Sequence, residues 1–197
     1  MPPMRHALAI AVLLAVSGTT AAYGATPPAY AGADQPAVHK HLDELFDALA
    51  KAGSEEEAKP IEDQILTAFL ESGSASIDLL MTRGASALQD GDIKTAKELF
   101  QSVTDIAPDF AEGWHQRARM EAVSGHDQAA MVNLQRTITL NPRQFEAYAE
   151  LGDMLQDYGD KAGALAMYRK ALALDPSYDD VARRVRELTR AVEGERI

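Results

Sequence analysis

Apolar residues recur along most of this chain at the spacing of an amphipathic α-helix. The first helical segment begins near Val38, and its apolar positions follow the pattern i, i+3, i+4, i+7: Leu42, Leu45, Phe46 and Leu49. A second segment follows Gly53, and its Ser54 and Glu57 have the spacing of a capping box. Pro60 either kinks this second helix or marks its true start. Residues 38–76 are therefore expected to form a helical hairpin or a degenerate copy of the repeat that follows.

A pattern of residue types repeats every 34 residues through the next hundred positions. It predicts three copies, at residues 77–110, 111–144 and 145–178. Each copy holds a large residue, a small residue four positions later, a glycine, an alanine, a second large residue and a closing proline. In order, these columns are Leu80/Trp114/Tyr148, Gly84/Ala118/Gly152, Gly91/Gly125/Gly159, Ala96/Ala130/Ala164, Phe100/Leu134/Tyr168 and Pro108/Pro142/Pro176.

The residue types in these columns predict a pair of packed helices in each copy. Small residues let the two helices approach closely, and large residues fill the space between them. The glycines suit the left-handed conformation that ends a helix, and the prolines disfavour helix in the residue before them. Asp92 and Asp160 are expected to cap the second helix of their copies, whereas His126 holds that place in the middle copy, where Asp127 is the alternative cap.

This pattern resembles the tetratricopeptide repeat family, which has the same period and the same order of residue types. The resemblance covers residues 77–178 and implies an all-α fold, an α-solenoid of three helical hairpins. Arg83 and Arg117 depart from the family pattern, in which leucine is usual. The stretch from LDELFDAL to IDLLMTRG is also similar to small exported alphaproteobacterial members of the family.

Both ends of such a solenoid need covers, because each repeat is buried only by its neighbours. We expect the N-terminal hairpin to cover the first repeat. Residues 179–197 are expected to form a C-terminal capping helix with an apolar stripe and a charged opposite face. The stripe consists of Val181, Val185, Leu188 and Val192.

The first 24 residues have the layout of a secretory signal peptide. A short head carrying Arg5 precedes an apolar run of ten residues, Ala7 to Val16, and small residues follow. The run is too short for a membrane-spanning helix, which needs about 20 residues. We expect cleavage after Gly24, with Ala22 and Ala31 as other usable sites and an uncleaved anchor as the alternative. Residues 25–37 then form a flexible leader, and the protein is periplasmic or secreted.

Composition excludes several classes of function. The chain has 19 Lys plus Arg against 30 Asp plus Glu, a formal net charge of −11, which argues against nucleic-acid binding. It has no cysteine, so disulfides and thiolate chemistry are excluded. We find no signature of a nucleophilic site, a phosphate loop or a metal site, and we expect no catalysis, cofactor or metal. His39 and His41 are two positions apart and would point to different faces of a helix.

What remains is binding of a partner protein or peptide. In the tetratricopeptide family, the first helices of successive repeats line a concave groove. That register assigns to the groove Met81, Ala85, Leu88, His115, Arg119, Ala122, Ala149 and Asp153. The Lys and Asn residues of the family's chaperone-type clamp are missing, which argues against a chaperone-tail receptor. Negative charge gathers in residues 38–112, either as a solvated surface or as an attraction for a basic partner.

The sequence thus predicts an exported scaffold. The alternative is a structural envelope protein that self-associates into homo-oligomers through the groove or the N-terminal hairpin.

Overall fold

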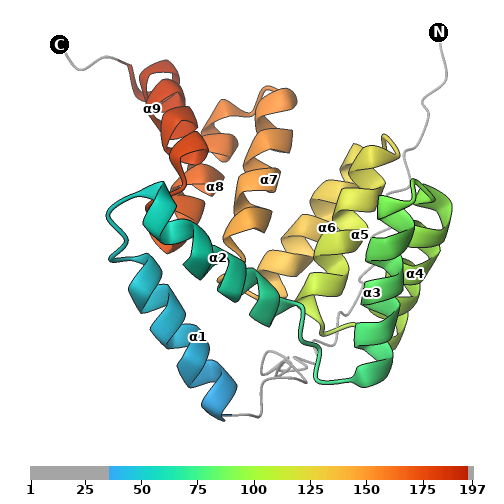
Figure 1. The fold of residues 1–197 in the computed structure, drawn as a ribbon. Helices are drawn as coiled ribbons and strands as arrows, with labels where there is room; N and C mark the ends of the chain where they lie inside the picture. Colours follow the sequence, from blue (N-terminus) through green and yellow to red (C-terminus); the bar gives the residue numbers. More distant parts are fainter. Residues whose placement is uncertain (1–35, 195–197) are drawn as a thin grey trace, which may run out of the picture.

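The computed structural model describes residues 36–194, in which nine α-helices follow one another without a strand (Figure 1). The helices are α1 (Pro36–Leu49), α2 (Glu55–Phe69), α3 (Ala75–Gln89), α4 (Ile93–Ile106), α5 (Ala111–Val123), α6 (Asp127–Leu140), α7 (Phe145–Asp157), α8 (Lys161–Leu174) and α9 (Asp179–Glu193). The predicted signal peptide lies outside the described residues. The all-α prediction is confirmed.

Two predicted helix boundaries near the N-terminus differ from the structure. Helix α1 begins at Pro36, inside the segment expected to be a leader up to residue 37, because proline fits the first turn of a helix, where its missing N–H needs no partner. Helix α2 begins at Glu55, so Pro60 lies inside it rather than at its start. Ser54 caps α2 by accepting a hydrogen bond from the Glu57 backbone N–H, and Glu57 in turn accepts one from Gly53. This cap fixes the start of α2 despite the proline.

Helices α3 to α8 form three antiparallel hairpins whose turns follow the predicted glycine column. Gly91, Gly125 and Gly159 have φ angles of 76°, 74° and 83°, a region that side chains other than glycine rarely adopt. Asp92 and Asp160 then accept hydrogen bonds from the backbone of α4 and α8. The N-cap of α6 is His126, which makes no side-chain cap and leaves Asp127 inside the helix.

In the first and third hairpins the two helices meet where a glycine faces an aromatic ring. A Cβ atom added to Gly84 would lie 2.6 Å from Phe100, and one added to Gly152 would lie 2.6 Å from Tyr168. Ala96, Ala130 and Ala164 are completely buried on the second helices. Each ring therefore fills the space that a missing side chain leaves, which fixes the distance between the helices.

Replacing Ala130 with leucine is expected to lower the free energy of unfolding by about 1–3 kcal/mol, because the added atoms overpack a contact that has no room. Gln128, two positions earlier on α6, is exposed, and its replacement with leucine should change stability by no more than about 0.5 kcal/mol. Chemical denaturation of the two variants checks the repeat register. Equal losses of stability would show that the register is wrong.

The C-terminal helix α9 covers the third hairpin. Val181 and Leu188 are buried against α8 in a cluster that includes Ala164, Leu165 and Tyr168. The arginines of α9 outside this contact, Arg183, Arg186 and Arg190, are exposed. Helix α9 is thus apolar toward the solenoid and charged on its outer face.

The hairpin of α1 and α2, here called the N-terminal hairpin, does not cover the first repeat. Its apolar residues, Leu45, Phe46, Leu49, Ile65 and Phe69 among them, form a cluster with Phe145, Leu174 and Tyr178 of the third repeat. The cluster within α3, α4 and α5 contains no residue of α1 or α2. Figure 1 shows α2 beginning on the side of α8 and α9 and running below α7 toward α3. The expected cover of the first repeat is therefore wrong, because the hairpin's apolar face finds its aromatic partners on the third.

One cation reinforces this contact from the loop between α6 and α7. The Arg143 guanidinium lies 3.9 Å from the centroid of the Phe46 ring, and its Nη1 is 2.5 Å from Asp43 Oδ1. Arg143 also donates to the backbone oxygen of Leu42. A stacked cation that also forms an ion pair positions α1 more specifically than apolar contact alone.

Candidate functional site

A buried polar cluster joins α5 to α7 in the middle of the solenoid. His115 is completely buried; its Nε2 lies 3.1 Å from Glu150 Oε2 and its Nδ1 lies 3.4 Å from Glu112 Oε2. Gln144 Nε2 donates to Glu112 Oε2 at 2.8 Å. Arg119 donates to Glu150 Oε1 at 2.8 Å and to Glu146 Oε2 at 3.1 Å. The side chains of this cluster are engaged with one another.

Charge in this cluster favours a protonated His115. Burial acts to lower the pKa of His115, but the charges and hydrogen bonds of Glu112 and Glu150 outweigh it and raise that pKa to about 9. Burial likewise acts to raise the pKa of Glu150, whereas His115 and Arg119 hold it below its usual value. The cluster therefore joins the second repeat to the third through partly buried ion pairs.

The raised pKa of His115 makes stability depend on pH. Because the pKa is higher in the folded chain than the unfolded value of 6.5, the stabilisation is complete below pH 6.5 and is lost as the pH rises toward 9. This difference in the pKa of His115 corresponds to about 3 kcal/mol in the free energy of unfolding. Burial and the charge of Asp175 raise the pKa of Glu62 to about 7. Glu62 therefore also makes the protein less stable as the pH rises, but in the range below pH 7. Urea denaturation between pH 7 and 9 isolates the histidine, and a His115→Gln variant should lack that slope.

The structure separates the predicted groove residues into two groups. Ala85 and Ala122 are exposed, and Leu88, Arg119 and Asp153 are partly exposed. The other three, Met81, His115 and Ala149, are buried. The exposed alanines lie on α3 and α5, so a partner has access to the first two repeats.

Three of the predicted groove residues differ from the expectation because neighbouring side chains cover them. The repeat register assigns His115 to the groove, but its ring nitrogens face Glu112 and Glu150. Met81 packs in the apolar cluster of α3, α4 and α5, and Ala149 packs against α8 and α9. Asp153 is partly exposed but pairs with Arg184 and accepts a hydrogen bond from Tyr168 Oη at 2.5 Å. Helical spacing predicts which face of the helix a residue lies on, but it does not predict whether neighbouring side chains cover that residue.

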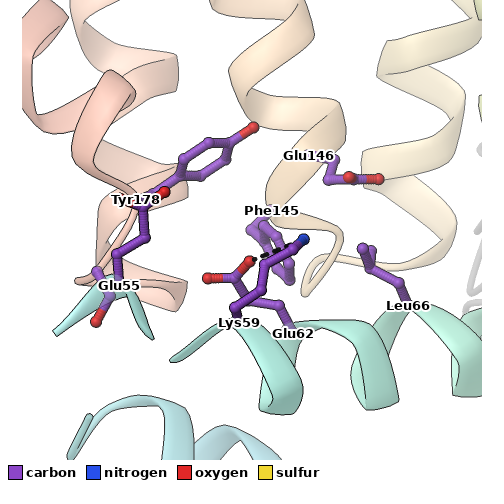
Figure 2. Close-up of a pocket in the computed structure, with 8 residues that line it drawn as sticks. Glu55, Lys59, Glu62, Leu66, Phe145, Glu146 and Tyr178 are labelled. Carbon is purple, nitrogen blue, oxygen red and sulfur yellow. Dashed lines mark ion pairs between the residues drawn. The ribbon is translucent and has the colours of Figure 1, made fainter. Parts of the chain in front are cut away.

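A pocket lies between α2 and the third repeat, and sequence reasoning did not find it (Figure 2). Its volume is about 180 Å³. Its lining residues come from α2, from the start of α7 and from the loop before α9: Glu55, Lys59, Glu62, Leu66, Phe145, Glu146, Ser177 and Tyr178. No sequence signal links α2 to α7 across eighty residues, because the repeat period describes contacts between neighbouring repeats only.

The pocket combines aromatic walls with carboxylates. The rings of Phe145 and Tyr178 meet edge to face, with centroids 6.2 Å apart. In Figure 2 Lys59 and Glu62 reach up from α2 toward Phe145 and Tyr178. The Lys59 Nζ lies 3.1 Å from Asp63 Oδ1 and 3.8 Å from Glu62 Oε2. Burial raises the pKa of the Tyr178 hydroxyl to about 12, assisted by nearby carboxylates, so this hydroxyl stays protonated and can donate.

Two further observations concern the described residues as a whole. Within residues 36–194 no group of three or more His, Asp or Glu side chains is arranged to hold a metal ion. No helix in the same range is both long enough and apolar enough to cross a membrane.

Comparison with known proteins agrees with this architecture. Residues 145–178 match the model of the tetratricopeptide repeat. A TPR repeat-containing protein of Rhizobium etli is 26% identical over 157 residues, which cover 80% of this chain and 77% of the relative.

Two solved structures with bound peptides share the fold. The first TPR domain of Spaghetti (RPAP3), bound to the HSP90 peptide SRMEEVD, has a TM-score of 0.55 at 18% identity, covering 59% of this chain and 93% of that one. The Yersinia enterocolitica chaperone SycD, in complex with a peptide of the translocator YopD, has a TM-score of 0.54 at 15% identity, covering 61% and 94%. At these identities the likeness shows the fold alone.

Stacked antiparallel hairpins with glycine turns and a covering last helix define an α-solenoid. The third hairpin matches the tetratricopeptide repeat, and the similarity of the chain to the Rhizobium relative supports the alphaproteobacterial resemblance.

Proposed function

We propose that this protein is an exported, periplasmic scaffold that holds a partner protein or peptide on the inner helices of its repeats. The observation that carries the proposal is the accessible surface of α3 and α5 at Ala85 and Ala122, where small side chains leave the helix backbone approachable. Solenoids of this kind use extended inner surfaces for binding. The two solved structures described above hold peptides on the same fold.

The test uses substitutions that block the surface without disturbing the core. A crosslinked pull-down from periplasmic extract identifies the partner of the unsubstituted chain. Ala85→Arg combined with Ala122→Arg should then weaken capture of that partner at least tenfold, because two long side chains would fill the surface. Ala129→Arg on α6 is the matched control, since Ala129 is also exposed but lies on a second helix. Equal capture by all three proteins would contradict the proposal.

Export is tested separately by the mass of the mature protein. Expression in a bacterial host with an intact envelope should yield a chain shorter by about 22 to 31 residues, the span of usable small-residue cleavage sites. A full-length chain in the membrane fraction would favour the anchor instead.

One observation favours self-association as a second candidate function. Leu79 is 51% exposed on α3, whereas Ala147, at the equivalent place in the third repeat, is completely buried against the preceding repeat. Ser86 is likewise exposed where Met120 is buried. Within residues 36–194, the side of α3 that would carry a preceding repeat is therefore open. Size-exclusion chromatography with light scattering separates a monomeric scaffold from a homo-oligomer that covers this side.

A further inference from the structure

We propose that the pocket between α2 and the third repeat binds a cationic side chain, of the lysine or arginine class, presented by the partner. The inference rests on the proposed scaffold function and names the chemistry of its partner. It concerns residues outside the predicted groove, and four observations support it.

The first observation is the shape and wall of the pocket. A volume of about 180 Å³ suits a single long side chain rather than a cofactor. Phe145 and Tyr178 form an aromatic corner in its wall, and Leu66 adds an apolar contact. The face of an aromatic ring attracts a cation, and an apolar contact accommodates the methylene stem that carries it.

The second observation is an excess of negative charge. Three carboxylates line the pocket, from Glu55, Glu62 and Glu146, against the single ammonium group of Lys59. That ammonium lies nearer to Asp63 than to Glu62, and its side chain is 61% exposed. Glu146 already accepts a hydrogen bond from Arg119, which leaves Glu55 and Glu62 with the least compensation. An anionic ligand is disfavoured here, and a cationic one is favoured.

The third observation is a buried acceptor behind the pocket. Asp175, at the end of α8, is completely buried, and its Oδ1 accepts a hydrogen bond from the Ser177 backbone N–H at 3.0 Å. Its Oδ2 has no hydrogen-bond partner. The Asp175 carboxylate interacts electrostatically with Glu62 and Lys59, which both line the pocket. A buried carboxylate oxygen without a donor is costly, and a positive charge in the pocket offsets that cost.

The fourth observation is that the pKa values of both Glu62 and Asp175 are raised. Burial raises the pKa of Glu62 to about 7, with further contributions from the negative charge of Asp175 and a smaller one from that of Asp63, while Lys59 acts in the opposite direction. Burial also raises the pKa of Asp175. A bound cation stabilises the ionised forms, so binding releases a proton and strengthens as the pH rises from 6 to 8.

The probe is a short peptide, acetyl-Gly-Arg-Gly-amide, and its control is the same peptide with citrulline, which has nearly the shape of arginine without the charge. Titration of the full mature chain, followed by amide chemical shifts in NMR, should show shifts at the starts of α2, α7 and α9. The arginine peptide should bind at least tenfold more tightly than the citrulline peptide, and more tightly at pH 8 than at pH 6. Equal affinities, or shifts confined to other helices, would overturn the inference.

Two variants locate the charge. Glu62→Gln should weaken the arginine peptide at least fivefold and remove most of its pH dependence, since glutamine resembles the protonated acid. Glu56→Gln changes an exposed neighbour on the same helix outside the pocket, and should leave affinity unchanged. Equal effects of the two substitutions would show a diffuse attraction to the acidic surface and would refute a defined site.

Failure of the pocket and failure of the scaffold function are distinguishable. If the arginine peptide does not bind, while Ala85→Arg with Ala122→Arg abolishes partner capture, the scaffold stands and the pocket inference fails. If the peptide binds as described but no partner is captured, the site stands and the scaffold function fails.

Discussion

Replacing His115 with alanine is expected to lower the free energy of unfolding by about 3–5 kcal/mol at pH 7, the cost of breaking a buried ion pair by removing one partner. The imidazole is completely buried, and both of its nitrogens face carboxylates. Its removal leaves Glu112, which is 5% exposed, beside a cavity without a counter-charge. The loss should be smaller at pH 9, where the histidine is itself partly deprotonated.

The control for this substitution is another histidine of the same hairpin. The side chain of His126 is 58% exposed, although its Nδ1 lies 2.8 Å from Glu121 Oε2. His126→Ala should therefore cost less than about 1 kcal/mol, as for a surface ion pair. Urea denaturation of the two variants measures both effects. A His115→Ala variant as stable as the unsubstituted chain would show that this histidine faces an open groove, as its spacing alone suggests.

Replacing Phe46 with alanine is the second substitution with a large expected effect. Phe46 is 8% exposed, packs against Phe69 with ring centroids 6.3 Å apart, and carries the Arg143 guanidinium on its face. Loss of a buried phenylalanine costs about 3–5 kcal/mol. Because repeats of a solenoid unfold with some independence, the loss should fall mainly on the N-terminal hairpin.

Leu70 gives the matched control for Phe46. It follows α2 directly and is 46% exposed, so Leu70→Ala should change stability by less than about 1 kcal/mol. Urea titration followed by helical circular dichroism should show an early partial loss of helix in the Phe46→Ala chain only. A single unchanged transition in that chain would contradict a hairpin held by this contact.

The repeats were predictable from sequence because their contacts are periodic. Glycine at 91, 125 and 159 and alanine at 96, 130 and 164 each perform the same packing or turning task in every copy. Identical local requirements leave identical residues at fixed spacing, and the match of residues 145–178 to the repeat model falls on the third of these copies.

The place of the N-terminal hairpin was not predictable in the same way. Its own helices could be read from Leu42, Leu45, Phe46 and Leu49, but the period extrapolates only to a neighbouring repeat. The partners of the hairpin, Phe145, Leu174 and Tyr178, lie a hundred residues further along and belong to a contact that occurs once. A contact that occurs only once produces no periodic pattern in the sequence, so the repeat spacing could not predict it.

The candidate site shows the same limit at the level of single residues. Helical register placed His115 and Arg119 on one face of α5, and the structure brings both to Glu150. Whether that face is open depends on Glu150 of α7, with which both side chains pair. The pocket at Glu62 and Tyr178 depends further on the docked hairpin.

Hydrogen exchange of the full mature chain, with and without Phe46→Ala, tests most directly where the N-terminal hairpin lies. If it lies on the third repeat, the substitution should speed exchange in α1, in α2, at the start of α7 and in the loop before α9, and leave α3 and α4 unchanged. Faster exchange in α3 and α4 with an unchanged third repeat would contradict this placement, because it would show a hairpin that covers the first repeat.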